Sequence, residues 1–210
     1  AIHAPEGSRA ESVFGTGRHP TTRLAEALLE RHLRVGDSVL DVGCGSGILS
    51  VAAARLGAVR VCAIDIAPAA RATAREMAKA NEVGHIVTVV DSPLETVGDR
   101  WSMVVANLHT QLFVALATAL AAHVAHDGVL LASGIPEPRA EAVATLFAGH
   151  GFRVVDSEHD QEEHWRAFCF RRDQAIVTAL RAPEECSATP DRLANRSGSK
   201  PPRSSTSPPA

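Results

Sequence analysis

Short apolar runs alternate with longer helical patterns along most of the chain. Apolar runs bounded by turn residues are typical of buried strands, and we expect such strands at 38–42, 60–64, 86–90, 103–106, 129–132, 151–157 and 165–170. Apolar residues at helical spacing predict helices at 20–34, 48–56, 68–81, 112–126 and 137–148. This alternation predicts an α/β fold built on a doubly wound, mostly parallel sheet.

Three segments in the C-terminal half of the chain depart from this alternation. Only Glu158–His164 separates the last two predicted strands, which is too short for a crossover helix and therefore predicts a C-terminal antiparallel hairpin. Asp127-Gly128 is predicted to form a turn before the strand at 129–132. Residues 183–210 contain six Pro, six Ser and Leu193 as their only large aliphatic residue, so we expect a disordered Pro/Ser-rich tail there.

Composition narrows the class of protein. The chain has 210 residues, 45% of them hydrophobic, and a formal net charge of −3, which argues against a generally basic surface and against direct nucleic-acid binding. Its four cysteines are far apart and form no CxxC pair, so neither a metal site nor a disulfide framework is expected. No apolar run is long enough for a membrane helix. We expect a cytoplasmic protein with buried free thiols at Cys44, Cys62 and Cys169.

A glycine-rich turn carries the first chemical signal. Asp41-Val-Gly-Cys-Gly-Ser-Gly47 follows a predicted strand and precedes a predicted helix, so Gly43 and Gly45 allow the backbone to approach a ligand closely. Its DxGxGxG spacing differs from the GxGxxG of nicotinamide dinucleotide sites. No Lys-Ser/Thr pair follows it, which excludes a phosphate-binding P-loop.

Polar residues at the ends of other strands extend this predicted site. Asp65 follows the second strand, where a carboxylate can accept hydrogen bonds from ribose hydroxyls, although it can also cap the helix that begins at Pro68. Asp91 follows the third strand and is either an adenine contact or a turn residue. Asn107 ends the fourth strand, where its amide can orient an incoming amine and hold a cofactor. The carboxyl ends of parallel strands line the ligand crevice of such sheets.

The segment Phe14-Gly-Thr-Gly-Arg-His-Pro-Thr-Thr22 is more specific than the glycine turn. Together with Asp41-Val-Gly-Cys-Gly-Ser-Gly-Ile-Leu-Ser, Ala63-Ile-Asp-Ile-x-Pro, Val105-Ala-Asn, Ser133-Gly-Ile and Glu162-Glu-x-Trp, it resembles the PrmA family. The members of this family are bacterial class I methyltransferases that act on a ribosomal large-subunit stalk protein. The resemblance runs from about residue 13 to 172, which we take as the methyltransferase domain, with residues 1–12 as a lead-in.

The resemblance implies a Rossmann-like sheet of seven strands with a reversed last strand. It also implies binding of S-adenosyl-L-methionine through Thr22, Gly43, Asp65 and Asn107. The implied reaction is N-methylation of amino groups, a lysine side chain or an N-terminal amine, of a ribosomal large-subunit or other protein. Asn107 is then the group that orients the acceptor, and His19 and His109 are candidates to lie near the methyl group.

The sequence departs from the family pattern at two places, of which the second, after Asn107, borders the acceptor site and leaves the identity of the acceptor open. Ser102 stands where the family usually has Asp, and Leu108-His109-Thr110 stands where it usually has Ile-Leu-Ala. The family also carries an N-terminal domain that recognises the ribosomal protein, and about a dozen residues precede the matching segment here, so either the chain is truncated or it finds its substrate in another way. Two alternatives therefore remain: a methyltransferase of a small-molecule acceptor on the same fold, and a cofactor-binding module without catalysis.

Overall fold

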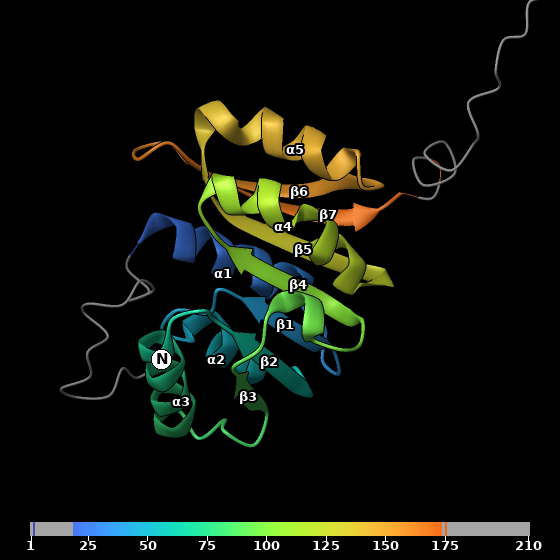
Figure 1. Ribbon diagram of the computed structural model, residues 1–210. Helices are drawn as coiled ribbons and strands as arrows, with labels where there is room; N and C mark the ends of the chain where they lie inside the picture. The colour runs from blue at the N-terminus through green and yellow to red at the C-terminus, as the bar shows by residue number, and fades with distance from the viewer. Residues whose placement is uncertain (1, 3–18, 174, 176–210) are drawn as a thin grey trace, which may run out of the picture.

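The computed structural model describes residue 2, residues 19–173 and residue 175 (Figure 1). Its helices are α1 (Pro20–His32), α2 (Ile48–Arg55), α3 (Pro68–Ala80), α4 (Thr110–His123) and α5 (Ala140–Ala148), with 3₁₀ turns η2 (Leu94–Thr96) and η3 (Glu137–Arg139). Its strands are β1 (Ser38–Val42), β2 (Arg60–Ile64), β3 (Val87–Val90), β4 (Trp101–Asn107), β5 (Val124–Pro136), β6 (Phe152–Asp160) and β7 (Trp165–Arg172). The predicted lead-in, the segment Phe14–Arg18 and the predicted tail at 183–210 lie outside the described residues, residue 2 excepted.

The seven strands of the described region form one sheet in the order β3-β2-β1-β4-β5-β7-β6. β1 to β5 are parallel to one another, whereas β7 runs antiparallel to both of its neighbours, β5 and β6. These pairings confirm the predicted mostly parallel, doubly wound α/β sheet and its C-terminal antiparallel hairpin. The chain leaves β1 towards β2 and β3 and later returns to β4 on the other side, and ligand crevices open at such reversals of strand order.

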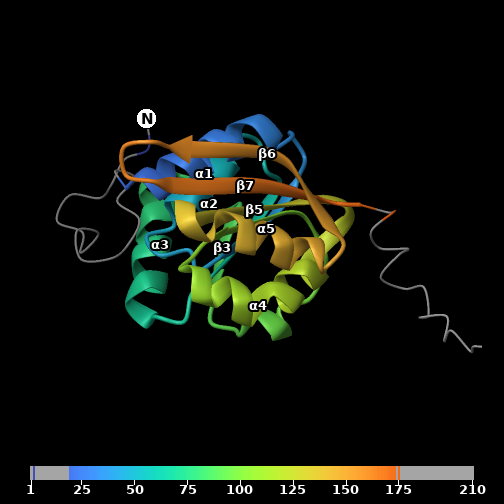
Figure 2. The same cartoon turned by 90° about the horizontal axis from the view of Figure 1, so that it is seen from above.

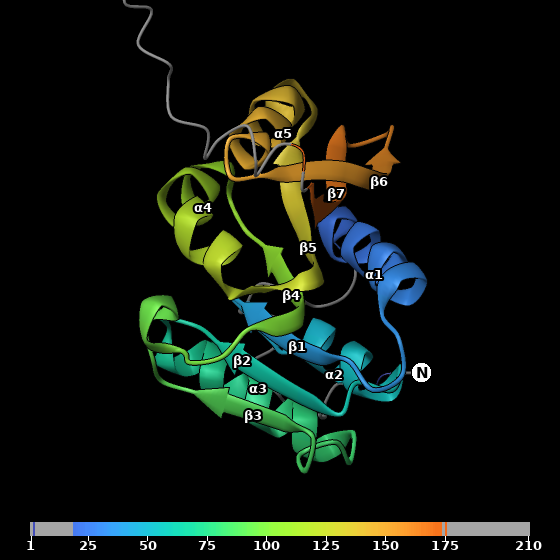
Figure 3. The same ribbon diagram turned by 90° about the vertical axis from the view of Figure 1, so that its right-hand side faces the viewer.

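Helices cover both faces of the sheet. α1, α2 and α3 lie on one face, and α4 and α5 lie on the other (Figure 3). Because side chains alternate along a strand, one strand serves both cores. In β4, Met103 and Val105 pack under the first group of helices, whereas Val104 and Ala106 pack under the second. The second core is rich in fully buried phenylalanines, which are Phe113, Phe147, Phe152 and Phe170.

The largest error in the sequence prediction concerns the start of β5. The helix expected to reach His126 ends at His123, and the turn expected at Asp127-Gly128 belongs to β5, which begins at Val124. The ladder between β4 and β5 shifts register here, since Trp101 pairs with Val124 but Met103 pairs with Val129. Residues 125–128 therefore form an irregularity within β5, between the pair at Val124 and the ladder that resumes at Val129.

Other boundaries differ by fewer residues. The helix expected over 137–148 begins as η3 and becomes α-helical only at Ala140, after Pro138. β6 continues to Asp160, which shortens the connection between the hairpin strands relative to the predicted Glu158–His164. β4 is longer than expected at both ends and includes Asn107 as its last residue. Asn107 therefore lies at the carboxyl end of its strand, which is the position expected for it.

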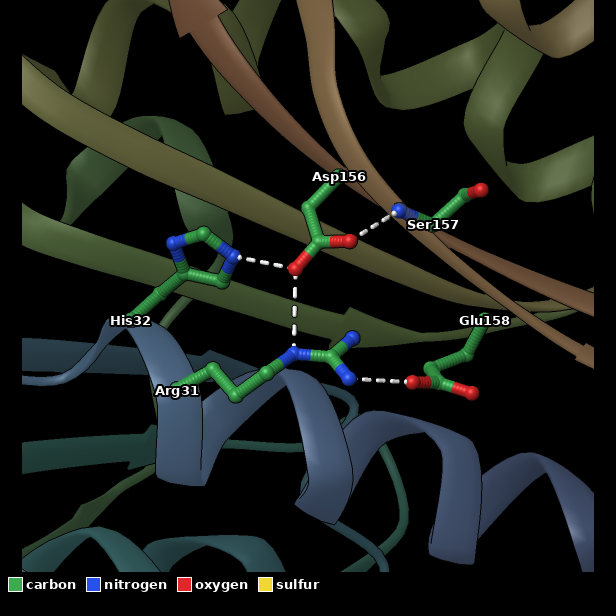
Figure 4. A network of polar contacts seen from close by, with 5 residues as sticks. All are labelled: Arg31, His32, Asp156, Ser157 and Glu158. Carbon is green, nitrogen blue, oxygen red and sulfur yellow. Dashed lines mark hydrogen bonds and ion pairs between the residues drawn. The ribbon is translucent and has the colours of Figure 1, made fainter.

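Polar contacts hold α1 along the edge strand β6 (Figures 2 and 4). The Nε atom of Arg31 lies 3.0 Å from Oδ2 of Asp156, and its Nη1 lies 2.5 Å from Oε1 of Glu158. The Nε2 atom of His32 lies 2.8 Å from the same Asp156 oxygen. Both basic residues lie in the last turn of α1, where cations suit the helix dipole. These contacts hold α1 against the edge of the sheet. They therefore also fix the first turn of α1, which reaches the candidate site.

Candidate functional site at the carboxyl ends of the strands

A cavity of about 470 Å³ opens at the carboxyl ends of β1, β2 and β4. The first turn of α1, the loop that follows β4 and Trp165 at the start of β7 also line it. Six of the seven predicted site residues line this cavity together, and these are His19, Thr22, Gly43, Gly45, Asp65 and Asn107. The fold therefore brings together residues that are up to 88 positions apart in the sequence, from His19 to Asn107.

The glycine turn forms one wall of the cavity. Gly43, Gly45 and Gly47 all have positive φ angles, of 73°, 54° and 80°. The backbone N–H groups of Gly43 and Cys44 donate to the carbonyl oxygen of Ile64 over 2.9 and 3.0 Å, which joins the turn to the end of β2. The turn therefore presents backbone rather than side chains to the cavity at Gly43 and Gly45.

The carboxylate of Asp65 joins two loops at the edge of the cavity. Its Oδ2 accepts a hydrogen bond from the N–H of Gly45 at 2.9 Å, and its Oδ1 accepts one from the N–H of Ala67 at 2.9 Å. Ala67 is the N-cap residue of α3, so Asp65 also holds the residue that precedes the helix, although α3 has no side-chain cap hydrogen bond of its own. The two interpretations do not exclude each other, because Asp65 lines the cavity while it holds both loops.

Thr22 and His19 come from the start of α1. His19 is the N-cap residue, and its Nδ1 lies 2.9 Å from Oγ1 of Thr21 and 3.4 Å from the Thr21 nitrogen. Thr22 is 1% exposed, and its Oγ1 has no hydrogen-bond partner among the described residues. The helix start is anchored from the sheet, since Oγ of Ser133 donates to the carbonyl oxygen of Thr21 at 2.7 Å. A buried hydroxyl without a partner is costly, so this position suits a polar ligand group.

Asn107 lines the cavity where the end of β4 meets β5. It pairs with Ser133 in the ladder, and Gly134 follows directly with a φ of 83°. The next two residues, Leu108 and His109, also line the cavity, and His109 is the exposed N-cap residue of α4. The segment that departs from the family pattern therefore lies directly beside the predicted acceptor-orienting amide.

Asp91 is the one predicted site residue that does not line the cavity. Its side chain is 73% exposed, and its Oδ2 lies 2.6 Å from Nη2 of Arg71. The neighbouring Ser92 lines the cavity instead. Asp91 was predicted to be an adenine contact or a turn residue, and the structure brings its neighbour Ser92 rather than Asp91 to the cavity.

Burial dominates the electrostatics beneath the glycine turn. Asp41 is 1% exposed, and burial raises its pKa to about 6, although a 2.5 Å hydrogen bond from Oγ of Ser50 opposes this rise. Burial also raises the pKa values of the thiols of Cys44 and Cys169, which are free and buried as expected, whereas Cys62 is only partly buried.

Among the described residues, no three His, Cys, Asp or Glu side chains are grouped to hold a metal ion. No described helix has both the length and the apolar character needed to cross a membrane.

Sequence reasoning missed three residues that shape the site. The ring of Trp165 packs edge-on against His19, with ring centroids 5.5 Å apart, and lines the cavity. Gly134 lies against Asn107, and Arg71 reaches from α3 to the loops after β2 and β3. Trp165 and Gly134 belong to quoted motifs but had no assigned role. Arg71 lies in an Ala-rich helix and carries no motif signal.

Comparison with known proteins identifies a family that this chain resembles over most of its length. A model of the family described as Ribosomal protein L11 methyltransferase (PrmA) matches residues 12–173. The chain is 45% identical over 159 residues to the ribosomal protein L11 methyltransferase of Pelotomaculum thermopropionicum, an alignment that covers 75% of this chain and 51% of that protein. It is 37% identical over 159 residues to the Thermotoga maritima protein of the same name, covering 76% and 59%. The chain thus spans about half the length of the curated relatives it matches.

Solved structures agree with this assignment. The structure of a ribosomal protein L11 methylase from Lactobacillus delbrueckii subsp. bulgaricus matches with a TM-score of 0.71 at 30% identity, covering 77% of this chain and 81% of that one. Magnesium protoporphyrin IX methyltransferase from Synechocystis PCC 6803, solved with bound SAM, matches with a TM-score of 0.58 at 24% identity, which shows the shared fold alone. With its fold, its cavity and these matches taken together, the chain belongs to the ribosomal protein L11 methyltransferase (PrmA) family.

Proposed function

We propose that this chain transfers a methyl group from S-adenosyl-L-methionine to an amino group, a lysine side chain or an N-terminal amine, of a ribosomal or other protein. The observation that carries the proposal is the single cavity in which the glycine turn, Asp65, Thr22 and Asn107 meet. Membership of the family and the names of its members support ribosomal protein L11 as the acceptor protein. We assign this activity to a domain formed by residues 13–172.

The residues of the cavity fit the proposed cofactor. Asp65 offers a carboxylate to the hydroxyls of a ribose, and Gly43 and Gly45, which also line the cavity, place no side chain between a ligand and the backbone. The buried Oγ1 of Thr22, which has no partner within the described part of the chain, gains one when a polar group of the cofactor lies beside it. We do not include Asp91 in this set, because its carboxylate pairs with Arg71.

The bound cofactor supplies a methyl group on a positively charged sulfur, which is already activated for transfer. The chain must therefore bind, align and desolvate the acceptor. A lysine amine has a pKa of about 10.4 in water and must release its proton before its lone pair can attack. The apolar side chains of Leu108, Leu112 and Trp165 around the cavity favour the uncharged amine.

Asn107 is the group we assign to the orientation of the acceptor. Its side-chain carbonyl oxygen can accept a hydrogen bond from the amine and so direct the lone pair along the line of the breaking bond. Alignment of this kind contributes roughly 7–11 kcal/mol to catalysis. His19 and His109 also line this cavity, and we assign them as the candidates to receive the proton that the amine releases.

The test uses the full-length protein with tritium-labelled S-adenosyl-L-methionine, purified ribosomal protein L11 and, separately, a metabolite extract. We expect label on amino groups of the ribosomal protein, located by mass spectrometry. Asn107→Ala should lower kcat by roughly 100-fold because the acceptor loses its alignment, and should weaken binding of S-adenosylhomocysteine less than tenfold.

The possible results separate the alternatives. Label confined to a metabolite would replace the protein acceptor with a small molecule. Binding of S-adenosylhomocysteine without transfer to either acceptor would leave a cofactor-binding module. Full turnover by Asn107→Ala with normal cofactor affinity would remove the orienting role of that residue.

A further inference from the structure

Arg71 is a buried arginine near the start of α3. It is 6% exposed, and α3 begins only three residues earlier, at Pro68. The N-terminal end of a helix carries partial positive charge, which disfavours a cation, and the burial of a charge is costly unless partners surround it. The position of Arg71 therefore requires contacts that compensate both costs.

The guanidinium of Arg71 finds these partners in two loops. Its Nη1 donates to the carbonyl oxygens of Asp65 and Ile66, at 2.8 and 3.0 Å. Its Nη2 lies 2.6 Å from Oδ2 of Asp91. Side chains of a helix lean towards its N-terminus, which brings the guanidinium back over the loop that precedes α3. One side chain thus joins the loop after β2 to the loop after β3.

Both loops contribute to the cavity described above. Asp65 and Ile66 line it from the first loop, and Ser92 lines it beside Asp91 in the second. Ile66 is 97% exposed, the highest value among the large hydrophobic residues of the described region. Because Arg71 holds the carbonyl of Ile66, this side chain stands at the edge of the cavity rather than packing into the protein. An apolar ring bound there would cover it.

We propose that Arg71 is a positioning residue for the adenosine half of the cofactor site. It holds the Asp65–Ile66 backbone and the Asp91–Ser92 loop in the arrangement that receives the ribose and the adenine, and it acts through these loops rather than through contact with the cofactor. This inference rests on the proposed function, because it takes S-adenosyl-L-methionine as the ligand.

The test compares three variants of the full chain by calorimetric titration with S-adenosylhomocysteine and with adenosine. Arg71→Met keeps most of the side-chain volume but removes every polar contact, and we expect it to weaken both ligands by roughly tenfold or more. Arg71→Lys keeps the charge but lacks the planar fork of donors, so we expect a smaller loss. If Arg71→Met does not fold, Arg71→Lys supplies the measurement.

Arg75→Met is the matched control. Arg75 lies one turn further along α3, is exposed, and donates to the carbonyl oxygen of Val89 at 3.0 Å, but it does not reach the loops of the cavity. We expect the affinity of this variant for both ligands to equal that of the wild type. In turnover assays, Arg71→Met should raise the KM for S-adenosyl-L-methionine while kcat at saturation stays within about twofold of the wild type, since only ground-state cofactor binding is disturbed.

Several results would overturn the positioning role. Affinity of Arg71→Met within twofold of the wild type, together with a lower melting temperature, would make Arg71 a structural residue only. Loss of affinity for S-adenosylhomocysteine with unchanged affinity for adenosine would place the disturbance outside the adenosine half. Wild-type protein that binds S-adenosylhomocysteine but transfers no methyl group would overturn the proposed function and leave this comparison intact.

Discussion

Gly134 lies directly against Asn107. A Cβ atom added to Gly134 would lie 3.0 Å from Oδ1 of Asn107 and 2.5 Å from the carbonyl oxygen of Leu108. The φ angle of Gly134 is 83°, a region that side-chain-bearing residues rarely adopt. The end of β5 can therefore approach the end of β4 only because residue 134 has no side chain. This contact confines the amide that we assign to the acceptor.

Gly134→Ala should disturb both stability and turnover. The left-handed backbone alone costs about 1 kcal/mol for alanine, and the contact with the Leu108 carbonyl forces an additional backbone shift. Because Asn107 must move with it, we expect kcat to fall by roughly 100-fold. Denaturant unfolding and single-turnover transfer measure the two effects.

Gly36→Ala provides the control for this prediction. Gly36 has a φ of 97°, and nothing lies within 4 Å of a Cβ added there. This variant therefore carries the backbone cost without the clash, and its activity should be normal. Equal activity of Gly134→Ala and Gly36→Ala would show that Gly134 does not confine Asn107.

Thr22→Val should separate ligand binding from stability. The hydroxyl of Thr22 is buried with no partner within the described part of the chain, and such groups cost roughly 1–3 kcal/mol. The ligand-free variant should therefore unfold at the same temperature as the wild type or at a higher one. Its affinity for S-adenosylhomocysteine should fall about fivefold or more, because one hydrogen bond to the ligand is lost.

Thr73→Val is the matched variant. Thr73 is 5% exposed, and its hydroxyl donates to the carbonyl oxygen of Ala69 within α3. Its replacement should leave the affinity for S-adenosylhomocysteine unchanged. A Thr22→Val variant that loses stability but keeps full affinity would remove Thr22 from the proposed cofactor contacts.

Asp41 should make the free energy of unfolding depend on pH. Burial raises its pKa from 3.8 to about 6 in the folded chain, so the folded state holds the proton more tightly than the unfolded state. The contribution to stability is therefore complete below the unfolded pKa and is lost as pH rises to about 6. A shift of this size corresponds to about 3 kcal/mol.

Asp41→Asn removes the titrating group while it keeps an acceptor for the Ser50 hydroxyl. We expect the difference in unfolding free energy between wild type and variant to change between about pH 4 and pH 6 and to stay constant at higher pH. Urea unfolding at intervals of pH measures it. A constant difference across the whole range would mean that Asp41 titrates normally in the folded chain.

The contacts between α1 and β6 should contribute modestly to stability. Arg31 and Asp156 are 45% and 30% exposed, and pairs with this exposure contribute about 0.2–1 kcal/mol. The pKa of Asp156 lies below its ordinary value, since contacts with His32, the Ser157 N–H and Arg31 together outweigh the effect of burial. The contribution of these contacts to the free energy of unfolding should be lost as pH falls below about 4 and Asp156 takes up a proton. A double-mutant cycle with Arg31→Ala and Asp156→Ala measures it, and no loss of coupling in 1 M salt would contradict an ionic origin.

Much of the fold follows from local patterns along the chain. The strands at 38–42 and 60–64 were predicted to the residue, because buried parallel strands are apolar throughout and are bounded by turn residues. The hairpin followed from the short connection between the last two strands. The predicted start of β5, at residue 129, was wrong because Asp127-Gly128 is a strong local turn signal, whereas β5 begins at Val124. Pairing with β4 across a register shift, a tertiary effect, overrides it.

Residues of the candidate site could be predicted where they belong to a sequence motif, but the contacts that they make with distant residues could not. Asp65 and Asn107 follow strands in the sequence, and parallel strands bring their ends to one edge. Asp91 obeys the same rule, yet its carboxylate turns to Arg71, a partner that nothing in the sequence indicates. Contacts between distant residues of this kind depend on how α3 packs, which periodicity alone does not encode.

The insertion of β7 between β5 and β6 has a consequence for synthesis of the chain on the ribosome. When residues up to 164 have left the exit tunnel, β5 still has an open edge and β6 has no strand beside it, because β7 is the partner of both in the described region. Phe168 and Phe170, which complete the core under α4 and α5, emerge only afterwards. The sheet can therefore close only when the last of its strands has been made, so premature termination before β7 would expose an unpaired edge prone to aggregation.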